Sequence, residues 1–275
     1  MSLLPLNANE ALYYELDQPS RTDAPTFVFV NAITGDTSMW QAAVGPALRA
    51  AGFGTLCYNF RGQPNSPYAD GLELTEQIIT GDLKYLVEEL KVERAVLTGL
   101  SIGGLYAAKA YLAGLKVSGL VLINTLRKIG PRLDWMNAAT LRLMQVAGPN
   151  LIRDVMTPLL FGPKFLQAHR HEFLQEDTVY DPLPPDSGAM NLIRCMRHTD
   201  WDIDYSKLTC PVLVMMGPND RIFYDAAIVE EQYATLPKAK RQDVPEAGHM
   251  LPVECPDAFV EAATEFASAL EYNGR

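Results

Sequence analysis

The sequence predicts an α/β fold with a mostly parallel, doubly wound sheet, and three observations lead to this expectation. Short segments along the chain are continuous apolar runs, which are typical of buried strands in a parallel sheet covered on both faces. Helical patterns lie between these runs, and parallel neighbours need such crossover connections. A long helical stretch then interrupts the alternation before the last strands. At 275 residues the chain is long enough for one large core or two smaller ones.

The expected elements follow one another in regular order. The apolar runs are residues 27–30 (FVFV), 55–58 (TLCY), 95–98 (AVLT), 120–123 (LVLI) and 212–216 (VLVMM). Two weaker candidates are an antiparallel edge strand at residues 11–16 and a short strand at residues 241–244. The expected helices are residues 40–51, 76–90, 103–115, 224–236 and 256–270.

Strand patterns disappear between residues 126 and 208, where helical segments rich in Leu, Met and Phe take over. Links between strands and helices are usually about 2–6 residues long, so this stretch is too long to be a connection. We expect it to be a helical cap, or lid, inserted between two late strands. Residues 1–125 and 209–275 are then expected to form the core, and residues 126–208 the cap.

The composition excludes several classes of protein. An apolar fraction of 48% and a charged fraction of 20% are typical of a soluble globular chain. A net charge of −10 without a basic cluster argues against binding to nucleic acid or to anionic membranes. The N-terminus has no pattern of a secretory signal and no apolar run is long enough to span a bilayer, so a cytoplasmic protein is expected. The four cysteines form no C-x-x-C pair and are expected to be free thiols, mostly buried.

Ser101 lies between small residues where an apolar run gives way to a helical pattern. Residues 99–103 read GLSIG and match the Gly-x-Ser-x-Gly nucleophile elbow, in the strand-turn-helix context that the motif requires. Gly99 and Gly103 permit the strained bend that exposes a serine at the top of a sheet. Ser101 is therefore a candidate nucleophile, although the same pattern fits a Gly-rich turn with a helix-capping serine.

A serine nucleophile needs a base, and His249 is the best placed of the four histidines. It lies in a Gly-bearing loop between the last expected strand and the last helix, where its side chain can reach the edge of the sheet. The alternative is a loop histidine that bonds only to the backbone. His169, His171 and His198 lie in polar stretches and are expected at the surface.

Asp220 is the candidate partner of that histidine, because it lies in the turn after the last long apolar strand. A carboxylate there can accept the ring N–H of His249, fix its tautomer and stabilise the imidazolium. The alternative is that Asp220 only caps the next helix. Asp225 and Glu246 are then the less favoured candidates for the carboxylate that contacts His249. The order Ser, Asp, His along the chain is the one found on the fold that carries this elbow.

The developing oxyanion needs backbone donors as well. The bend at the serine aims the N–H of Ile102 into the same space, and the turn NAITGD at residues 31–36 follows the strand 27–30. Small Ala32 and flexible Gly35 let this turn close tightly, so the N–H of Ile33 is the candidate second donor. The alternative is an ordinary loop.

With these parts in place, the chain resembles the α/β-hydrolase superfamily, in particular its cap-bearing serine esterases and lactonases. The similarity covers essentially the whole length. It is carried by GLSIGG (99–104), GPND (217–220), AGHMLPVECPDAF (247–259) and NFRGQPNSP (59–67), the last of which is similar to the Arg-Gly loop of the family. The resemblance implies the α/β-hydrolase fold with a helical cap. A serine in the elbow, where related dehalogenases and epoxide hydrolases carry Asp, implies acyl chemistry.

Two departures from the family pattern stand out. The family usually has His-Gly where this chain has Asn31-Ala32, and its Arg-Gly-x-Gly-x-Ser loop appears here as RGQPNS at residues 61–66. NAITGD is also similar to the corresponding stretch of homoserine acetyltransferases, which share the fold but transfer an acyl group to an alcohol. This local similarity keeps acyl transfer open as an alternative.

We therefore expect a serine hydrolase of carboxylic esters, thioesters or lactones. Ser101 would attack the carbonyl, His249 would act as base and then as acid, and Asp220 would orient His249. No metal or organic cofactor is needed, and the expected partner is a small acyl substrate, with no nucleic acid or membrane. The alternatives are an acyltransferase acting on an alcohol or amine and, less favoured, a non-catalytic binding protein on the same fold.

The substrate is not readable from the sequence. Apolar side chains of the inserted stretch can either line a pocket or seat the lid on the sheet, and helical apolar stripes are more often core. These residues are Leu126, Trp135, Met136, Leu141, Met144, Phe161 and Phe165. Arg127 and Lys128 follow a strand and are candidates either for contact with an anionic group or for a solvated position.

Overall fold

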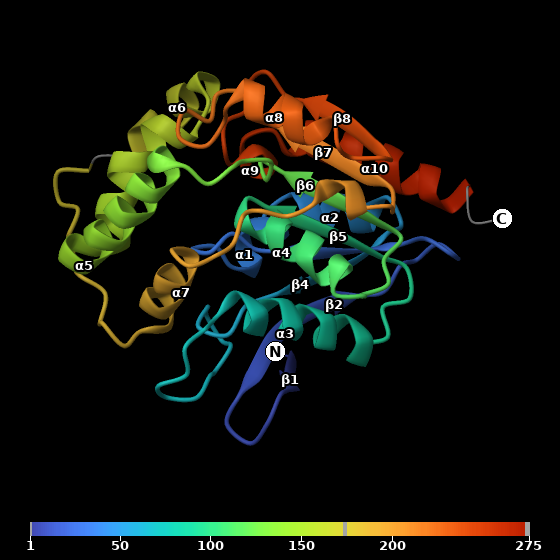
Figure 1. Ribbon diagram of the computed structural model, residues 1–275, viewed down its shortest axis with the longest axis horizontal. Coiled ribbons are helices and arrows are strands. Elements are labelled where there is room, and N and C mark those ends of the chain that lie inside the picture. Colours follow the sequence, from blue (N-terminus) through green and yellow to red (C-terminus); the bar gives the residue numbers. More distant parts are fainter. Residues whose placement is uncertain (1, 173–174, 273–275) are drawn as a thin grey trace.

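The computed structural model describes residues 2–172 and 175–272, and these contain one eight-stranded sheet in the order β1-β2-β4-β3-β5-β6-β7-β8 (Figure 1). The strands are β1 (Ser2–Pro5), β2 (Ala11–Asp17), β3 (Thr26–Val30), β4 (Gly54–Tyr58), β5 (Ala95–Leu100), β6 (Gly119–Ile123), β7 (Val212–Met216) and β8 (Ala239–Asp243). All neighbours from β4 to β8 are parallel, whereas β1 with β2 and β2 with β4 are antiparallel. The predicted doubly wound, mostly parallel α/β sheet is confirmed.

The sheet differs from the prediction at both of its edges. The segment predicted as an edge strand is β2, which is antiparallel but second from the edge, because β1 pairs outside it with Ser2 opposite Tyr14. At the other edge, β8 begins two residues before the predicted start at residue 241. Its sequence, AKRQD, is half-exposed and charged, as edge strands often are, so a search for apolar runs places its bounds poorly.

Side chains of the central strands alternate between two cores, as the period of two in a strand requires. Val28 and Val30 belong to the core cluster on one face, and Phe27 and Phe29 to the cluster on the other. The first face is covered by α3 (Glu76–Glu89), α4 (Ile102–Leu112) and α8 (Ala226–Tyr233). The second is covered by α1 (Thr37–Gln41), α2 (Val44–Ala50) and α10 (Pro256–Tyr272), with the short α9 (Leu251–Glu254) before α10.

The predicted helix at residues 40–51 is two helices, α1 and α2, with a break at Ala43. Pro46 explains the break, because a proline lacks the N–H that a helix interior needs and its ring clashes with the carbonyl four residues earlier. In the structure Pro46 lies in the first turn of α2, where no such bond is required. Asp36 starts α1 by accepting a hydrogen bond from the Ser38 N–H at 2.8 Å.

The segment between β6 and β7, which we call the inserted segment (residues 126–208), contains helices and irregular loops but no strand in its described residues. It contains α5 (Pro131–Leu160), α6 (Pro163–Ala168) and α7 (Gly188–Met196), with 3₁₀ turns at Arg170–Glu172 and Tyr205–Lys207. The helix α5 is kinked at Gly148, whose φ of 73° is a left-handed conformation that suits glycine. Figure 1 shows α5, α6 and α7 together beyond one end of the sheet. The division of the chain into core and cap stays a prediction.

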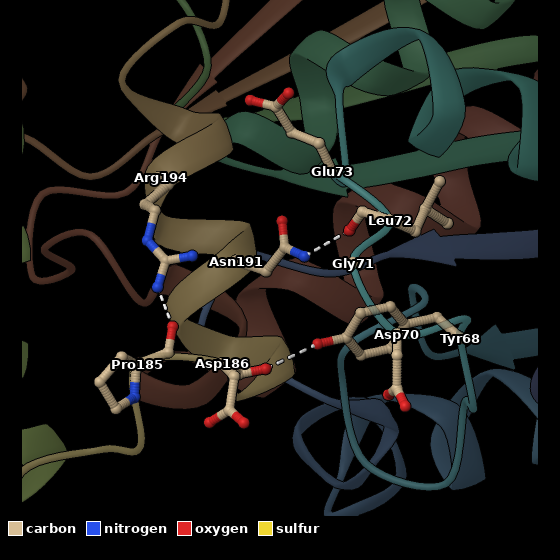
Figure 2. A pocket seen from close by; sticks show the side chains of 9 residues that line it. All are labelled: Tyr68, Asp70, Gly71, Leu72, Glu73, Pro185, Asp186, Asn191 and Arg194. Atoms are coloured by element: carbon tan, nitrogen blue, oxygen red, sulfur yellow. Dashed lines mark hydrogen bonds between the residues drawn. The ribbon is translucent and has the colours of Figure 1, made fainter.

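The helix α7 is tied to the core through a loop that precedes α3. The Asn191 side chain donates to the Leu72 carbonyl at 2.6 Å and accepts from the Leu74 N–H at 3.0 Å. Figure 2 shows the first of these bonds, and beside it Tyr68 donating to the Asp186 carbonyl at 3.2 Å. Tyr68, Leu72, Asp186 and Asn191 line a cavity of about 700 Å³ between the loop and α7. The Asn191 amide thus forms one of the connections between the inserted segment and the core.

We expect Asn191→Ala to lower the free energy of unfolding by about 1–2 kcal/mol, because two partly buried backbone groups lose their partner. Urea unfolding measures this change. The matched control is Asn150→Ala, which removes an exposed bond within the inserted segment, from Asn150 to the Val179 carbonyl, and should cost less than about 0.5 kcal/mol. Equal losses in the two variants would contradict a role of Asn191 in connecting the inserted segment to the core.

Candidate active site

Ser101 lies at the tip of the turn between β5 and α4, in a strained backbone conformation with φ of 58° and ψ of −120°. Non-glycine residues at positive φ are uncommon and concentrate at functional sites. The conformation requires close approach of the flanking backbone. A Cβ on Gly103 would overlap the carbonyl oxygens of Val30 and Asn31, and one on Gly99 would overlap the backbone of Gly103. Both glycines of the motif are therefore required by packing.

His249 and Asp220 meet in the interior. The His249 Nδ1 lies 2.6 Å from the Asp220 Oδ2, and the two side chains are 7% and 1% exposed. Asp220 follows β7 and His249 follows β8, so the contact joins the carboxyl ends of two neighbouring strands. A short, buried contact of this kind fixes which ring nitrogen faces the carboxylate, and it leaves the other nitrogen for a different partner.

The Asp220 carboxylate is built to stay ionised. Burial raises its pKa, but the charge and hydrogen bond of His249, the Phe223 N–H and the charge of Arg127 more than offset this, so the pKa lies below its ordinary value. The Oδ1 atom accepts hydrogen bonds from the N–H groups of Ile222 at 3.0 Å and Phe223 at 2.9 Å. Asp220 thus holds its own turn as well as the ring of His249.

The two substitutes considered for Asp220 have other roles. Asp225 caps α8 by accepting from the N–H groups of Ala227 and Ile228. Glu246 is exposed and pairs with Lys164 at 2.8 Å. Capping of the helix therefore falls to Asp225, and Asp220 is free to contact His249.

Asn124 joins the loops after β6, β7 and β8. Its Nδ2 donates to the carbonyls of Gly248 at 3.0 Å and His249 at 2.8 Å, and its Oδ1 accepts from the Gly217 N–H at 2.8 Å. The residue is 3% exposed and has a φ of 47°, a left-handed conformation that Asn tolerates better than most residues. A single amide therefore fixes the relative position of the Asp220 and His249 loops.

Glu254 holds the His249 loop from the other side. Its Oε2 accepts from the Gly248 N–H at 2.9 Å and its Oε1 from the Met250 N–H at 3.0 Å, the two residues that flank His249. The Oε2 also accepts from the Gly162 N–H of the inserted segment at 2.6 Å. Burial raises the pKa of this carboxyl although the three N–H groups act against it. The His249 N–H itself donates to the Leu160 carbonyl at 2.5 Å.

The turn that carries Ile33 is closed by a bond of 3.0 Å from the Gly35 N–H to the Ala32 carbonyl. Gln63 holds it from outside, because its Nε2 donates to the Ala32 carbonyl at 3.0 Å and its Oε1 accepts from Asn31. The fully buried Asn31 also donates to the Tyr58 carbonyl and accepts from Trp40. Both departures from the family pattern noted in the sequence therefore take part in one buried network beside this turn.

Ile33, Ile102, Ser101 and His249 line a common cavity of about 150 Å³ under the inserted segment. Ile102 begins α4, and the first N–H groups of a helix have no partner within it, so its N–H is available to a ligand. The larger cavity of Figure 2 is lined by none of these four residues. The structure thus brings all five predicted site residues to neighbouring strand ends, while their chemical roles stay predictions.

The Ser101 Oγ accepts a hydrogen bond of 2.9 Å from Arg127 Nη2, and no bond between Ser101 and His249 is found in the described structure. Arg127 is 5% exposed and lies on the loop after β6. The sequence raised this residue only as one that either contacts an anion or faces water. A single arginine beside an apolar strand carries no signal of burial, so its contact with Ser101 was not predicted.

The apolar residues considered as lining or lid contacts divide between several environments. Met136 lines the cavity, whereas Leu126 packs in the sheet core and Leu141 and Met144 in a cluster of the inserted segment itself. Phe161 and Phe165 stack on each other. Trp135 is 77% exposed, so neither interpretation of this residue is correct. Within this set, contact with the sheet core is found for Leu126 and cavity lining for Met136, so seating on the sheet is not the role of most of these residues.

The remaining candidates are peripheral. His171 and His198 are exposed and His169 is half-exposed, as predicted. Cys57 and Cys195 are buried, Cys210 and Cys255 are partly buried, and all four are free. Among residues 2–172 and 175–272 no group of three or more His, Cys, Asp or Glu side chains is arranged to hold a metal. In the same residues no helix is long and apolar enough to cross a bilayer.

The comparisons of this chain with known proteins all find hydrolases. The model of the alpha/beta hydrolase family matches residues 27–262. RutD of Shigella flexneri, whose name proposes a carbamate hydrolase, is 23% identical over 250 residues that cover 89% of this chain and 91% of RutD. Two solved structures are similar at 25% identity. The enol-lactonase of Burkholderia xenovorans LB400 has a TM-score of 0.76, and the match covers 96% of this chain and 100% of the lactonase. A thermophilic esterase of Thermogutta terrifontis has a TM-score of 0.77, and the match covers 95% of this chain and 94% of the esterase.

We expect Asn124→Gly to lower the free energy of unfolding by about 2–4 kcal/mol, because three buried backbone groups lose their partner while the left-handed conformation stays permitted. Denaturant unfolding measures this change. Asn124→Ala should cost about 1 kcal/mol more, the price of a Cβ at this φ. Stability of Asn124→Gly equal to that of the unchanged protein would show that the amide does not hold the loops.

Proposed function

Because the chain belongs to the alpha/beta hydrolase family, we propose that it is a serine hydrolase that cleaves carboxylic esters, thioesters or lactones through an acyl-enzyme on Ser101. The observation that carries the proposal is the buried 2.6 Å contact of His249 with Asp220, in the wall of the cavity that Ser101 also lines. The relatives named as an esterase, an enol-lactonase and a proposed carbamate hydrolase support hydrolysis at an acyl carbon.

In the proposed reaction the Ser101 Oγ attacks the carbonyl carbon and its proton passes to His249 Nε2. The negative charge of Asp220, 2.6 Å from Nδ1, stabilises the imidazolium so formed. The N–H groups of Ile33 and Ile102 donate to the oxyanion, and each such donor is worth on the order of 3 kcal/mol. His249 then gives the proton to the leaving oxygen or sulfur. Water attacks the acyl-enzyme with His249 again as base, and the acid product leaves.

Attack requires the Ser101 hydroxyl to donate its proton to His249. In the structure the hydroxyl oxygen accepts from Arg127, which uses a lone pair and leaves the hydroxyl proton free to be donated. Rotation about the Cα–Cβ bond of serine moves the hydroxyl between staggered positions and needs no backbone movement. The hydroxyl can therefore turn toward His249 while the strained backbone stays in place.

Acyl transfer to an alcohol or amine is the second candidate. The cavity supports it, because Leu133, Met136, Ile152 and Met156 of the inserted segment give it an apolar wall that limits access of water. Product analysis with an added alcohol or amine separates the two reactions. An ester or amide product supports transfer, whereas the free acid as sole product across acceptors supports hydrolysis.

We expect a fluorophosphonate to label the protein at Ser101 and Ser101→Ala to abolish the label. Hydrolysis of p-nitrophenyl butyrate should fall by at least about 10³-fold in Ser101→Ala and in His249→Ala, because each removes a group that acts only with the other. His198→Ala is the matched control, since this histidine is exposed and should leave both readouts unchanged. Equal labelling of the protein and of Ser101→Ala would remove Ser101 from the mechanism.

A further inference from the structure

Arg127 is a buried cation that lacks an ion-pair partner among residues 2–172 and 175–272. The partly buried Arg61, by contrast, lies 2.9 Å from a Glu10 oxygen and 2.7 Å from an Asp82 oxygen. Arg127 forms no ion pair with any described carboxylate. Burial lowers the pKa of its guanidinium to about 10, although the charges of Asp220 and Tyr205 raise it. Because this pKa lies well above 7, the group carries its positive charge at neutral pH. A buried charge is normally paired, which makes this one a candidate for binding an anion from outside the chain.

Aromatic rings hold the guanidinium in one orientation. Its Cζ lies 4.5 Å from the centre of the Trp201 ring and 4.3 Å from that of Phe223. Such contacts stabilise a cation through the faces of the rings and leave the edge of the guanidinium for hydrogen bonds. The Arg127 carbonyl accepts from Gln232 at 2.9 Å, which fixes the backbone of the residue as well. The group is therefore oriented before any ligand arrives.

Donors of this group remain unused in the described structure. Nη2 donates to the Ser101 Oγ at 2.9 Å and to the Asn124 carbonyl at 2.7 Å. Nε of Arg127 is buried with no partner, and so is Nε1 of the neighbouring Trp201. Unpaired buried donors are rare in proteins and are typical of places where a ligand or water completes the bonding. Two of them here belong to side chains that line the Ser101 cavity.

The surroundings favour an anion over other ligands. Arg127 is the one side chain with a full positive charge among the described residues that line the Ser101 cavity, and no carboxylate lines it. The residue also lines an adjoining cavity of about 170 Å³ together with Lys128 and Arg132. Asp225 lines that second cavity as well and Lys128 is paired with Glu231, so among the described residues the positive charge that faces the Ser101 cavity is that of Arg127.

We propose that Arg127 binds a carboxylate of the substrate, which lies only a few bonds from the acyl carbon that Ser101 attacks. The inference rests on the proposed function, since it takes Ser101 as the nucleophile. The short distance from Nη2 to Oγ means that a group bound to the guanidinium lies next to the reacting carbonyl. A planar carboxylate matches the edge of a guanidinium with two hydrogen bonds. The cavity of about 150 Å³ is smaller than most ligand sites, so the substrate class is short.

Binding of the carboxylate also prepares the nucleophile. When the substrate oxygen takes the hydrogen bond of Nη2, the Ser101 Oγ loses the donor that occupies one of its lone pairs. The hydroxyl then turns to His249, and both lone pairs become available for attack. A substrate without the carboxylate leaves Arg127 in competition for Ser101. Recognition and activation therefore depend on the same hydrogen bond, and selectivity should appear in kcat as well as in KM.

The test compares two substrates that differ by one charge, the mono-p-nitrophenyl ester of succinic acid and its methyl ester. We expect kcat/KM for the acid to exceed that for the methyl ester by at least about 10-fold, and Arg127→Met to bring the ratio close to one. Lys128→Met is the matched control, because Lys128 is exposed and paired with Glu231 and should leave the ratio unchanged. A ratio at or below one in the unchanged protein, or an unchanged ratio in Arg127→Met, overturns the proposal.

Two further arms complete the test. 4-Acetoxybenzoate and its methyl ester place the charge on the alcohol side, so comparison of the two pairs shows which part of the substrate carries the carboxylate. Calorimetric titration of Ser101→Ala with monomethyl succinate needs no turnover, and adding Arg127→Met should weaken binding at least about 10-fold. Binding that is absent, or unaffected by Arg127→Met, overturns the proposal. If Ser101 is labelled by the fluorophosphonate but the protein shows no preference for the charged substrate, the proposed function stands and the role of Arg127 is overturned. If carboxylate binding depends on Arg127 but Ser101 is not labelled, carboxylate binding by Arg127 stands and Ser101 is overturned as the nucleophile.

Discussion

The backbone conformation of Ser101 is the constraint on which the site depends. Its φ of 58° is held from both sides of the turn. On the strand side, β5 ends just before Ser101, and the Ser101 N–H donates to the Ile123 carbonyl at 2.7 Å. On the helix side, Gly103 lets the first turn of α4 lie against the carbonyls of Val30 and Asn31. Strain of this kind persists only where the surroundings over-determine it. The hydroxyl is thus fixed at one point on the sheet edge, and every other group of the site must be brought to that point.

Buried polar side chains bring them there. Asn124 and Glu254 hold the loops after β6, β7 and β8 near the site, and Gln63 holds the turn after β3. Each such bond contributes only about 1 kcal/mol net, but an unpaired buried group costs about 1–3 kcal/mol, so the loops have few alternative arrangements. The inserted segment joins the same network, because Glu254 accepts from Gly162 and the His249 N–H donates to Leu160.

The sequence predicts the parts of this arrangement that follow local rules. Continuous apolar runs locate the central strands, and the GLSIG turn, the GPND turn and the loop around His249 place three polar residues at strand ends that a parallel sheet brings together. The edge strand β8 is half-exposed and charged, so its bounds were missed, and Pro46 splits a helix that periodicity alone joins. Asn124, Glu254 and Arg127 carry no local signal, because their importance comes from contacts between residues far apart in the chain. Arg127 is buried by Trp201 and Phe223, which lie more than seventy positions away.

The most direct test of the account is a crystal structure of the protein after reaction with a phosphonate ester. We expect continuous density from phosphorus to the Ser101 Oγ, with His249 Nε2 at about 2.6–3.2 Å from an oxygen of the adduct and the N–H groups of Ile33 and Ile102 directed at the phosphoryl oxygen. An adduct on a different side chain would contradict the account. So would an adduct on Ser101 with the ring of His249 out of hydrogen-bond reach.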